Sequence, residues 1–331
     1  MIGPTVSSAQ PAASVPSAGI KRLSVVTVNW NSREDLAACL ASLAAQSYGE
    51  LEVLIVDNAS TDGSAEMVRA RFPQFTLLEQ TSNLGFAEGC NVGIRNATGS
   101  WVAMLNNDAV ADPEWAKALV SAAERAPESC GMLQSLMLFQ RSPPTINSTG
   151  IGLRRSGGGF DRDEGGQVPV TTASTPWEAI FCPTAGAAAY RRSMLEAISL
   201  STGYFDPAHF CYYEDLDLGW RARLAGYDAL YVPQSVVHHK FHGSTARRSR
   251  AWLAKLATIN RVRTLLKNAS GSFIVRSLPS SCWQLLRLPF VCGPSALLGY
   301  ASAVYASLEL RAEVEAKRRV ERGSVETRWV E

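Results

Sequence analysis

Short apolar runs alternate with amphipathic segments along the first 130 residues of the chain. The runs are rich in Val, Leu and Ile, which is typical of strands buried on both faces of a parallel sheet. We predict such strands at residues 23–29, 53–57, 75–79 and 101–105. Between them, apolar side chains recur at helical spacing, for example Leu36, Leu40 and Leu43. The alternation predicts an α/β fold with a doubly wound, mostly parallel sheet and helices on both faces.

Polar side chains stand at or just after the ends of three of these strands, at Asn29, Asp57 and Asp108. The carboxyl ends of parallel strands meet at one edge of a sheet, where open α/β sheets bind ligands. Asp57 alone has a simpler explanation, because Asp62 and Ser64 suit the cap of a following helix and indicate an ordinary strand–turn–helix connection. Three polar strand ends together predict a ligand cleft.

Two common phosphate-binding motifs are absent from the sequence. No Gly-x-Gly-x-x-Gly follows the first strand, and no Gly-x-x-x-x-Gly-Lys-Ser/Thr occurs in the chain. The sequence therefore argues against a dinucleotide-binding Rossmann fold and against the P-loop class of nucleotide-binding proteins.

The regular pattern weakens between residues 132 and 175. Glycines at 157–159 and 165–166, close to Asp161, predict a mobile surface loop, either a lid over the cleft or a simple insertion. A run of small residues at 185–190 permits close approach to a ligand or close packing of a strand.

A carboxylate pair, Glu214 and Asp215, precedes a predicted helix whose apolar face carries Leu216, Trp220 and Leu224. The pair either caps the helix and interacts with its dipole, or serves as a general base. A helix N-terminus is expected to lower the carboxylate pKa, so that the base stays ionised at neutral pH.

Three of the four histidines in the chain, His238, His239 and His242, lie close together. With Asp108 they would supply the oxygen and imidazole ligands that suit a divalent ion such as Mg²⁺ or Mn²⁺. The alternative is a polar loop at the end of a strand.

The net charge of +2 conceals an uneven distribution. Residues 229–308 contain ten Lys or Arg and no Asp or Glu, which leaves 22 basic against 30 acidic residues elsewhere. Such asymmetry predicts an anionic partner: nucleic acid, an anionic lipid surface or a phosphate-bearing substrate. The basic region has no recognisable nucleic-acid motif, so we do not expect nucleic acid.

Residues 288–308 carry no charge and are long enough to span a bilayer, but Pro and Gly make them only mildly apolar. We expect residues 282–310 to lie in a membrane interface, with two soluble helices as the alternative. Residues 1–20 are rich in Ser, Ala and Pro, lack the apolar core of a signal peptide and predict a disordered tail. Seven scattered cysteines without a Cys-x-x-Cys pair favour reduced thiols and a cytosolic compartment.

Several motifs resemble, in order, those of the family 2 glycosyltransferases with the GT-A fold, most closely the bacterial rhamnosyltransferase-like branch. The resemblance covers about residues 22–250 and includes the segments 25–31, 56–64, 83–91, 105–108, 203–206, 213–218 and the segment around His238. It implies a GT-A domain at residues 21–250, followed by a basic helical extension at residues 251–331.

The resemblance also implies a reaction. It indicates inverting transfer of a sugar, with rhamnose favoured, from a dTDP- or UDP-sugar to a hydroxyl of a lipid-linked or polysaccharide acceptor in cell-envelope glycan synthesis. Such an enzyme would be cytoplasmic and peripheral at the inner face of the cell membrane, where an anionic surface is an expected partner. The alternative is a sugar-nucleotide- or polyanion-binding protein without turnover.

Site residues follow from the same resemblance. Asp215 is the expected catalytic base, and Glu214 is the second candidate. The divalent metal, Mg²⁺ or Mn²⁺, is assigned to Asp108 with His238 as first choice and His239 as second. The residues expected to contact the nucleotide sugar are Thr27, Asn29, Asp57, Asn58, Asn83, Gly85, Asn106 and Asn107. Asn106 replaces a carboxylate of the family, which removes one negative charge and is expected to weaken metal binding.

Overall fold

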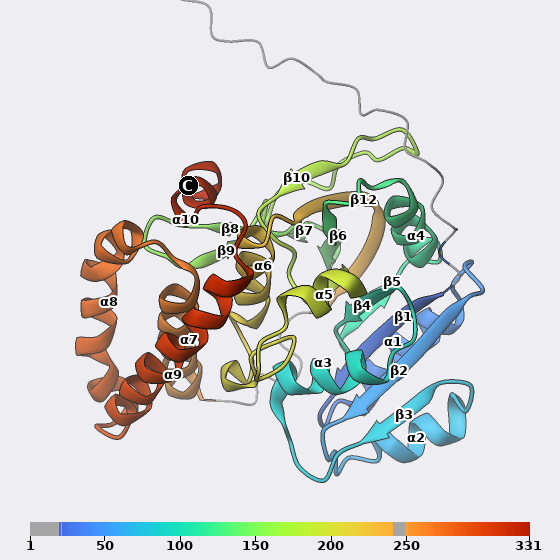
Figure 1. The fold of residues 1–331 in the computed structure, drawn as a ribbon. Helices are drawn as coiled ribbons and strands as arrows, with labels where there is room; N and C mark the ends of the chain where they lie inside the picture. The colour runs from blue at the N-terminus through green and yellow to red at the C-terminus, as the bar shows by residue number, and fades with distance from the viewer. Residues whose placement is uncertain (1–19, 21, 241–248) are drawn as a thin grey trace, which may run out of the picture.

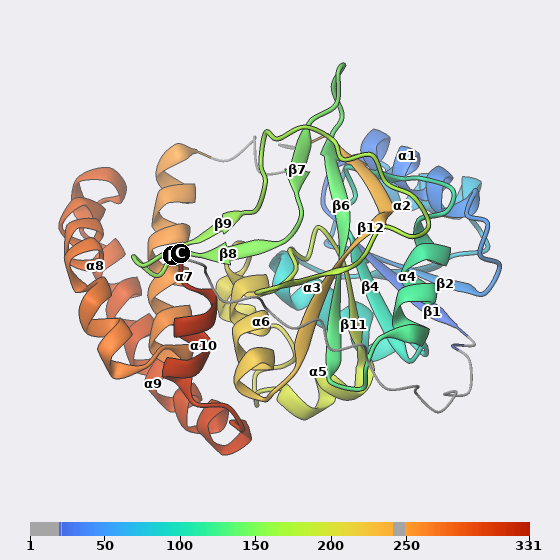
Figure 2. The same cartoon turned by 90° about the horizontal axis from the view of Figure 1, so that it is seen from above.

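The computed structural model describes residues 20, 22–240 and 249–331. The predicted tail at residues 1–20 lies outside this range except for Ile20, as do His242, Arg247 and Arg248. A central sheet carries helices on both faces, and four further helices pack at one end (Figures 1 and 2). The predicted α/β architecture with a C-terminal helical extension is confirmed.

Four consecutive strands form the parallel half of the sheet, in the order β3–β2–β1–β4. Their bounds are Leu23–Asn29 for β1, Leu51–Asp57 for β2, Thr76–Glu79 for β3 and Trp101–Leu105 for β4. Asn29 lies opposite Asp57 in the register of β1 and β2. The two polar strand ends therefore meet at the same edge, as the sequence predicts.

The other half of the sheet is mixed. β11 (Ala187–Arg191) runs antiparallel between β4 and β6 (Cys130–Phe139), and β6 is parallel to β12 (Asp228–His239). The shorter strands are β5 (Ala109–Ala111), β7 (Ile146–Ser148) and β10 (Glu178–Ile180), with β8 (Ile151–Leu153) and β9 (Gly159–Asp161) forming a separate hairpin. The small-residue run thus supplies a central strand, because Ala187–Ala189 pack closely between two neighbours.

Alternate side chains of each strand enter two different cores, because successive residues of a strand face opposite sides of the sheet. Val25 packs with α1, α2 and α4, whereas Val26 packs with α3, α5 and α6. The helices are α1 (Arg33–Ala44), α2 (Ser64–Arg71), α3 (Gly85–Asn96), α4 (Trp115–Arg125), α5 (Arg192–Ile198) and α6 (Glu214–Leu224). The sheet is therefore covered on both faces, as its apolar strands require.

The C-terminal helices share a third core with the sheet domain. They are α7 (Arg250–Asn268), α8 (Gly271–Cys292), α9 (Ala296–Lys317) and α10 (Arg322–Trp329). Trp220 of α6 packs edge-on against Phe273 of α8, with ring centroids 5.9 Å apart, and Leu265 of α7 belongs to the same cluster. Among the described residues, no helix combines the length and apolar character needed to cross a membrane.

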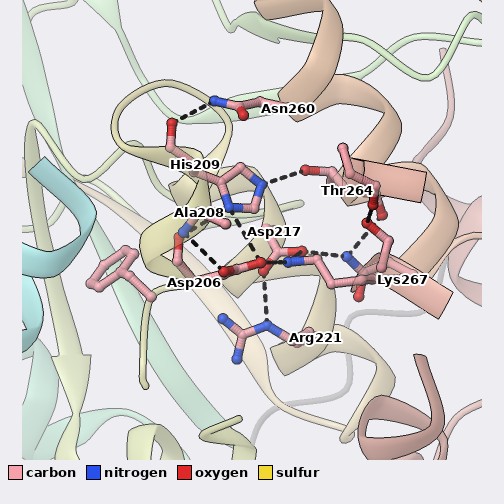
Figure 3. Close-up of polar contacts among 12 residues, drawn as sticks. Asp206, Ala208, His209, Asp217, Arg221, Asn260, Thr264 and Lys267 are labelled. Carbon is pink, nitrogen blue, oxygen red and sulfur yellow. Dashed lines mark hydrogen bonds and ion pairs between the residues drawn. The ribbon is translucent and has the colours of Figure 1, made fainter. Parts of the chain in front are cut away.

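A buried ionic network joins α7 to the segment that precedes and opens α6 (Figure 3). Lys267 Nζ lies 2.6 Å from Asp206 Oδ2 and 3.0 Å from Asp217 Oδ1, and all three side chains are buried. Arg221 Nε lies 3.0 Å from the other oxygen of Asp217, and Asn268 Nδ2 donates to Asp217 Oδ1 at 2.9 Å. Buried charges are tolerated only when they are paired in this way.

The network fixes the protonation states of its members. Burial alone would raise the pKa of Asp206 and Asp217, but the Lys267 ammonium and neighbouring cations hold both pKa values below the usual range. Burial, reinforced by Lys267, lowers the pKa of His209 to about 4. His209 is therefore neutral at pH 7, with Nε2 3.2 Å from Thr264 Oγ1 (Figure 3).

The charge asymmetry of the sequence has partly an internal origin. Lys267 forms ion pairs with two buried carboxylates, and Arg261 is buried with Nη1 3.1 Å from Ser281 Oγ. These two of the ten basic residues in 229–308 face protein groups and are not available to an anionic partner.

Replacing Lys267 with Met is expected to lower the free energy of unfolding by roughly 3–5 kcal/mol, because buried Asp206 loses its ion pair with Lys267 and Asp217 keeps only the one with Arg221. Urea denaturation measures this change. Lys255→Met, at a partly exposed position of the same helix, is the matched control and should change it by less than about 1 kcal/mol. Equal stability of the two variants would contradict the structural role of Lys267.

His209 should make the protein less stable as the pH falls from 7 to 5. An unfolded His binds a proton near pH 6.5, whereas the folded His209 does so only near pH 4, so acid favours the unfolded state in this window. The loss amounts to about 2 kcal/mol at pH 5. In His209→Gln the free energy of unfolding, measured with urea at each pH, should fall less steeply between pH 7 and 5. Parallel pH profiles for the two proteins would refute this assignment.

Candidate active site

A cleft of about 420 Å³ opens at the carboxyl edge of the parallel strands. Its walls come from segments far apart in the sequence, including the ends of β1 and β2, the 83–86 loop, the 106–108 segment, the β8–β9 hairpin, the 210–216 segment, His239 and Trp252. The volume lies in the range of small-molecule sites. The polar strand ends predicted to form a ligand cleft are therefore at or directly behind it.

Six of the residues predicted to bind the nucleotide-sugar donor or the metal line the cleft. They are Asn58, Asn83, Gly85, Asn106, Asn107 and Asp108. Asn58 Nδ2 donates to the carbonyl of Gly85 at 3.0 Å, and Asn83 Oδ1 accepts from Gly85 N at 2.9 Å, so the 83–85 loop is fixed to the end of β2. Gly85 has φ +82°, and a Cβ there would lie 2.6 Å from the Phe210 ring. Only glycine fits this approach without displacing Phe210.

Three predicted nucleotide contacts, Thr27, Asn29 and Asp57, are buried and are not among the residues that line the cleft. Asn29 Nδ2 donates to Asp57 Oδ1 at 3.0 Å, and Asn29 Oδ1 accepts from Asn107 Nδ2 at 2.8 Å. The second oxygen of Asp57 accepts from Ser60 N at 2.9 Å. In this structure both Asp57 oxygens therefore hold the wall of the cleft, and its contact with a nucleotide base stays a prediction.

His239, and not His238, faces the cleft beside Asp108. His239 Nε2 lies 3.0 Å from Asp108 Oδ1 and 3.3 Å from Asn106 Nδ2, and its Nδ1 lies 2.8 Å from Asn147 Oδ1. His238 is the adjacent residue of β12, so it points to the opposite side and its Nε2 lies 3.2 Å from Asp112 Oδ1. This placement corrects the sequence-based preference for His238 as the metal ligand.

The donor atoms at this end of the cleft fit a divalent metal of modest protein affinity. Asp108 offers a carboxylate and His239 an imidazole, a set that suits Mn²⁺ or Mg²⁺ when substrate phosphates complete the coordination. Within the described residues, no group of three or more His, Cys, Asp or Glu side chains is arranged to hold a metal. The amide of Asn106 stands where a further carboxylate would strengthen such a site.

The two carboxylates of the 214–215 pair have different environments. Asp215 Oδ1 accepts from Leu216 N at 2.8 Å, and its Oδ2 accepts from Thr184 Oγ1 at 3.2 Å and Ala185 N at 3.3 Å. Glu214 is buried, and its Oε2 has no hydrogen-bond partner among the described residues. The three hydrogen bonds to Asp215 favour its ionised form, whereas the charged form of Glu214 is supported by a backbone hydrogen bond alone.

Burial decides the pKa of both groups. It raises the pKa of Glu214 well above the usual range, and the charge of Asp215 adds to this effect. It also raises the pKa of Asp215, against the opposing hydrogen bonds. The expected lowering by the helix N-terminus is therefore wrong, because a helix dipole contributes about 1 kcal/mol whereas desolvation of a carboxylate costs several. Both carboxyl pKa values are thus raised, that of Glu214 more strongly, and the hydrogen bonds favour the negative charge on Asp215.

The backbone before this pair is held in an unfavourable conformation. Phe210, Tyr212 and Tyr213 have φ values of 61°, 66° and 73°, in a region that costs roughly 1–2 kcal/mol for residues with a side chain. Asn260 of α7 offsets this cost, because its Nδ2 lies 2.7, 3.0 and 2.9 Å from the carbonyls of His209, Cys211 and Tyr212. The helical extension thus shapes the segment that presents Asp215.

Residues 210–213 are also connected to the loop at Asn83 and Gly85, which is predicted to bind the nucleotide sugar. The Phe210 carbonyl accepts from Phe86 N at 2.6 Å and Ala87 N at 3.1 Å, in the first turn of α3. The Phe210 ring packs edge-on against Trp252 of α7, with centroids 5.9 Å apart. One peptide therefore connects the loop at Asn83 and Gly85, helix α7 and the carboxylate pair.

Several cleft residues escape prediction from the sequence. Asn147, Asp161 and Thr184 line the cleft, as does Trp252 from the extension. Burial raises the pKa of Asp161 to about 6. The glycines near Asp161 indicate the right segment, but as a mobile loop. In the structure Gly157, Gly158 and Gly159 belong to the β8–β9 hairpin, in which Gly159 pairs with Leu153, whereas Gly165 and Gly166 follow it in a turn.

Comparisons with known proteins agree with this geometry. The sequence model of glycosyl transferase family 2 matches residues 24–199. The N-acetylglucosaminyl-diphospho-decaprenol L-rhamnosyltransferase of Mycobacterium tuberculosis is 30% identical over 267 residues, which are 70% of this chain and 80% of the relative.

Solved structures show the same fold at low sequence identity. The Pyrobaculum calidifontis mannosyltransferase PcManGT, in complex with GDP-Man and Mn²⁺, matches with a TM-score of 0.54 at 20% identity over 97% of this chain and 91% of that one. GalNAc-T7 with UDP, GalNAc and Mn²⁺ matches with a TM-score of 0.63 at 15% identity, over 89% of this chain and 59% of that one. With the GT-A fold and the family match in agreement, the chain belongs to glycosyltransferase family 2, on its rhamnosyltransferase-like side.

Proposed function

We propose that the protein transfers a rhamnosyl residue from a dTDP- or UDP-linked donor to a hydroxyl of a lipid-linked N-acetylglucosamine acceptor at the cytoplasmic face of the membrane. Similarity to the mycobacterial rhamnosyltransferase supports the sugar and the acceptor. The observation that carries the proposal is the cleft itself, which is lined by a hydrogen-bonded Asp215 and by Asp108 beside His239.

Asp215 is the proposed general base. The acceptor hydroxyl attacks the anomeric carbon, its proton passes to an Asp215 oxygen, and the bond to the nucleoside diphosphate breaks in the same displacement. One displacement inverts the anomeric centre. Because burial raises the pKa of Asp215, its carboxylate is a stronger base than a solvent-exposed aspartate. A protonated Glu214 beside it avoids placing a second charge in the buried site.

The leaving diphosphate requires stabilisation of negative charge. Asp108 and His239 would hold a divalent metal, which when bound supplies positive charge to the departing phosphate oxygens. Asn147 keeps the His239 ring in place through its Nδ1 and so leaves Nε2 directed at Asp108. Asn106 lowers the charge of this group, so the donor diphosphate is expected to provide much of the metal affinity.

Asp215→Asn should reduce transfer by about 10²–10⁴-fold, the range for loss of a general base. Donor binding should persist, as thermal stabilisation by dTDP- and UDP-sugars with and without Mn²⁺ would show. Glu214→Gln is the matched control, because an amide resembles the protonated acid, and it should reduce transfer less than about tenfold. A larger loss in Glu214→Gln than in Asp215→Asn would assign the base to Glu214. Donor binding without transfer in the unmodified protein would instead support a binding protein.

Asn260→Ala should lower kcat about 10–100-fold, because the carbonyls that lose their hydrogen bonds shape the segment that presents Asp215. Any rise in KM for the donor should be smaller, because the Phe210 carbonyl keeps its hydrogen bonds from Phe86 N and Ala87 N. Steady-state kinetics with varied donor measures the two constants separately. Asn96→Ala, at an exposed asparagine that donates to the Val92 carbonyl at 2.9 Å, is the control and should behave like the unmodified protein. An unchanged kcat in Asn260→Ala would show that residues 209–213 keep their conformation without the hydrogen bonds from Asn260.

A further inference from the structure

Large apolar side chains lie exposed on α8 and α9. Among the residues that the structure describes, the exposed large hydrophobics outside these two helices are Val170 and Tyr212. We define the α8–α9 apolar face by its most prominent members, Val275, Trp283, Leu286, Phe290, Leu297 and Leu298. Phe290 is 90% exposed and Leu298 76%. Patches of this kind on a water-soluble surface usually mark an interaction site.

The α8 part of the face follows helical geometry. Val275, Leu286 and Phe290 recur at spacings of eleven and four residues on the outer side, while Phe273, Ser277 and Leu288 point into the protein. Both sides of the helix are thus apolar, although one faces solvent. Figures 1 and 2 agree in placing α8 at the outer edge of the molecule, on the side away from β2 and β3.

From the start of α8 to Leu308, the charged side chains are all basic. Residues 229–308 contain no Asp or Glu, so α8 and the first three turns of α9 have no acidic side chain. Arg276 and Arg287 flank the apolar positions, and the Arg287 guanidinium lies 4.4 Å from the centre of the Trp283 ring. Trp beside Arg, with aliphatic side chains below, is the composition of a helix that lies in a lipid interface.

The face adjoins the cleft. Cys292, at the end of α8, lies with Sγ 3.2 Å from the Ala251 carbonyl at the start of α7. The next residue, Trp252, lines the cleft and packs against Phe210. The turn between α8 and α9, with Phe290 and Leu297 on either side, is therefore a neighbour of the cleft wall.

We propose that the α8–α9 apolar face docks on an anionic bilayer surface, with Phe290, Leu297 and Leu298 inserted among the lipids and Arg276 and Arg287 at the headgroups. Docking in this orientation brings the lipid-linked acceptor to the Trp252 side of the cleft. Delivery of the acceptor rests on the proposed function, whereas bilayer binding does not. A second copy of the chain fits the face less well, because a twofold contact would bring arginines to arginines without acidic partners.

Co-sedimentation of the full chain with lipid vesicles tests the docking directly. We expect binding to vesicles containing phosphatidylglycerol that is at least tenfold stronger than to phosphatidylcholine alone, and weaker at high salt. Leu286→Glu and Phe290→Glu should each reduce binding at least tenfold. Val170→Glu, at a valine that is 94% exposed elsewhere, is the matched control and should bind as before. Thermal stabilisation by donor sugars verifies that each variant is folded.

Transfer assays separate the two proposals. Phe290→Glu should keep its activity on a water-soluble acceptor and lose at least tenfold on an acceptor embedded in vesicles. No transfer to either acceptor by the unmodified protein, with vesicle binding intact, would refute the proposed reaction and leave the docking. Equal vesicle binding by the unmodified protein and Phe290→Glu would overturn the docking, as would an absence of binding. Dimerisation in sedimentation that Phe290→Glu abolishes, without vesicle binding, would assign the face to a second copy.

Discussion

The pairing of Lys267 with Asp206 and Asp217 is the constraint on which the catalytic half of the structure depends. Each carboxylate lies at one end of the 206–217 segment, and the ammonium that pairs with both comes from α7, while Arg221 supplies the second positive charge at Asp217. A charge without its partner at this depth costs more than most other contacts contribute. The ion pairs and the apolar contacts of α7 therefore act together to hold this helix against the segment that carries Asp215.

Burial also decides the chemistry of the cleft. A helix N-terminus favours ionised carboxylates at 214 and 215, yet removal from water has the larger effect and raises the pKa of both groups. The two carboxyl groups then differ in the hydrogen bonds that support their charged forms. Asp215 receives three donors, while one oxygen of Glu214 has none among the described residues. Two adjacent acids of nearly equal intrinsic pKa thereby differ in how well their charged forms are supported, and the charge is better supported on Asp215.

Local patterns in the sequence predict much of the fold and part of the site. Apolar runs and polar strand ends locate β1, β2 and β4, because parallel strands place their ends together whatever the details of packing. To choose between His238 and His239, one must know which face of β12 points to the cleft, and the sequence alone leaves this open. β7 to β9 have only three residues each, too few to show a period. Asn260 and Lys267 act across about 50 or more residues of sequence, and no local pattern signals them.

The hydrogen bonds from Asn260 to the carbonyls of His209, Cys211 and Tyr212 have a consequence for how such enzymes diversify. A helical region that receives the acceptor, as we propose, could be exchanged between relatives as a module if it had no other role. Here α7, which belongs to this region, also carries Asn260, which shapes the backbone before Asp215, and Lys267, which pairs with the carboxylates on either side of it. Under the proposed function, the surface of α8 and α9 can change to receive another acceptor without disturbing Asp215 only if the inner face of α7 is kept.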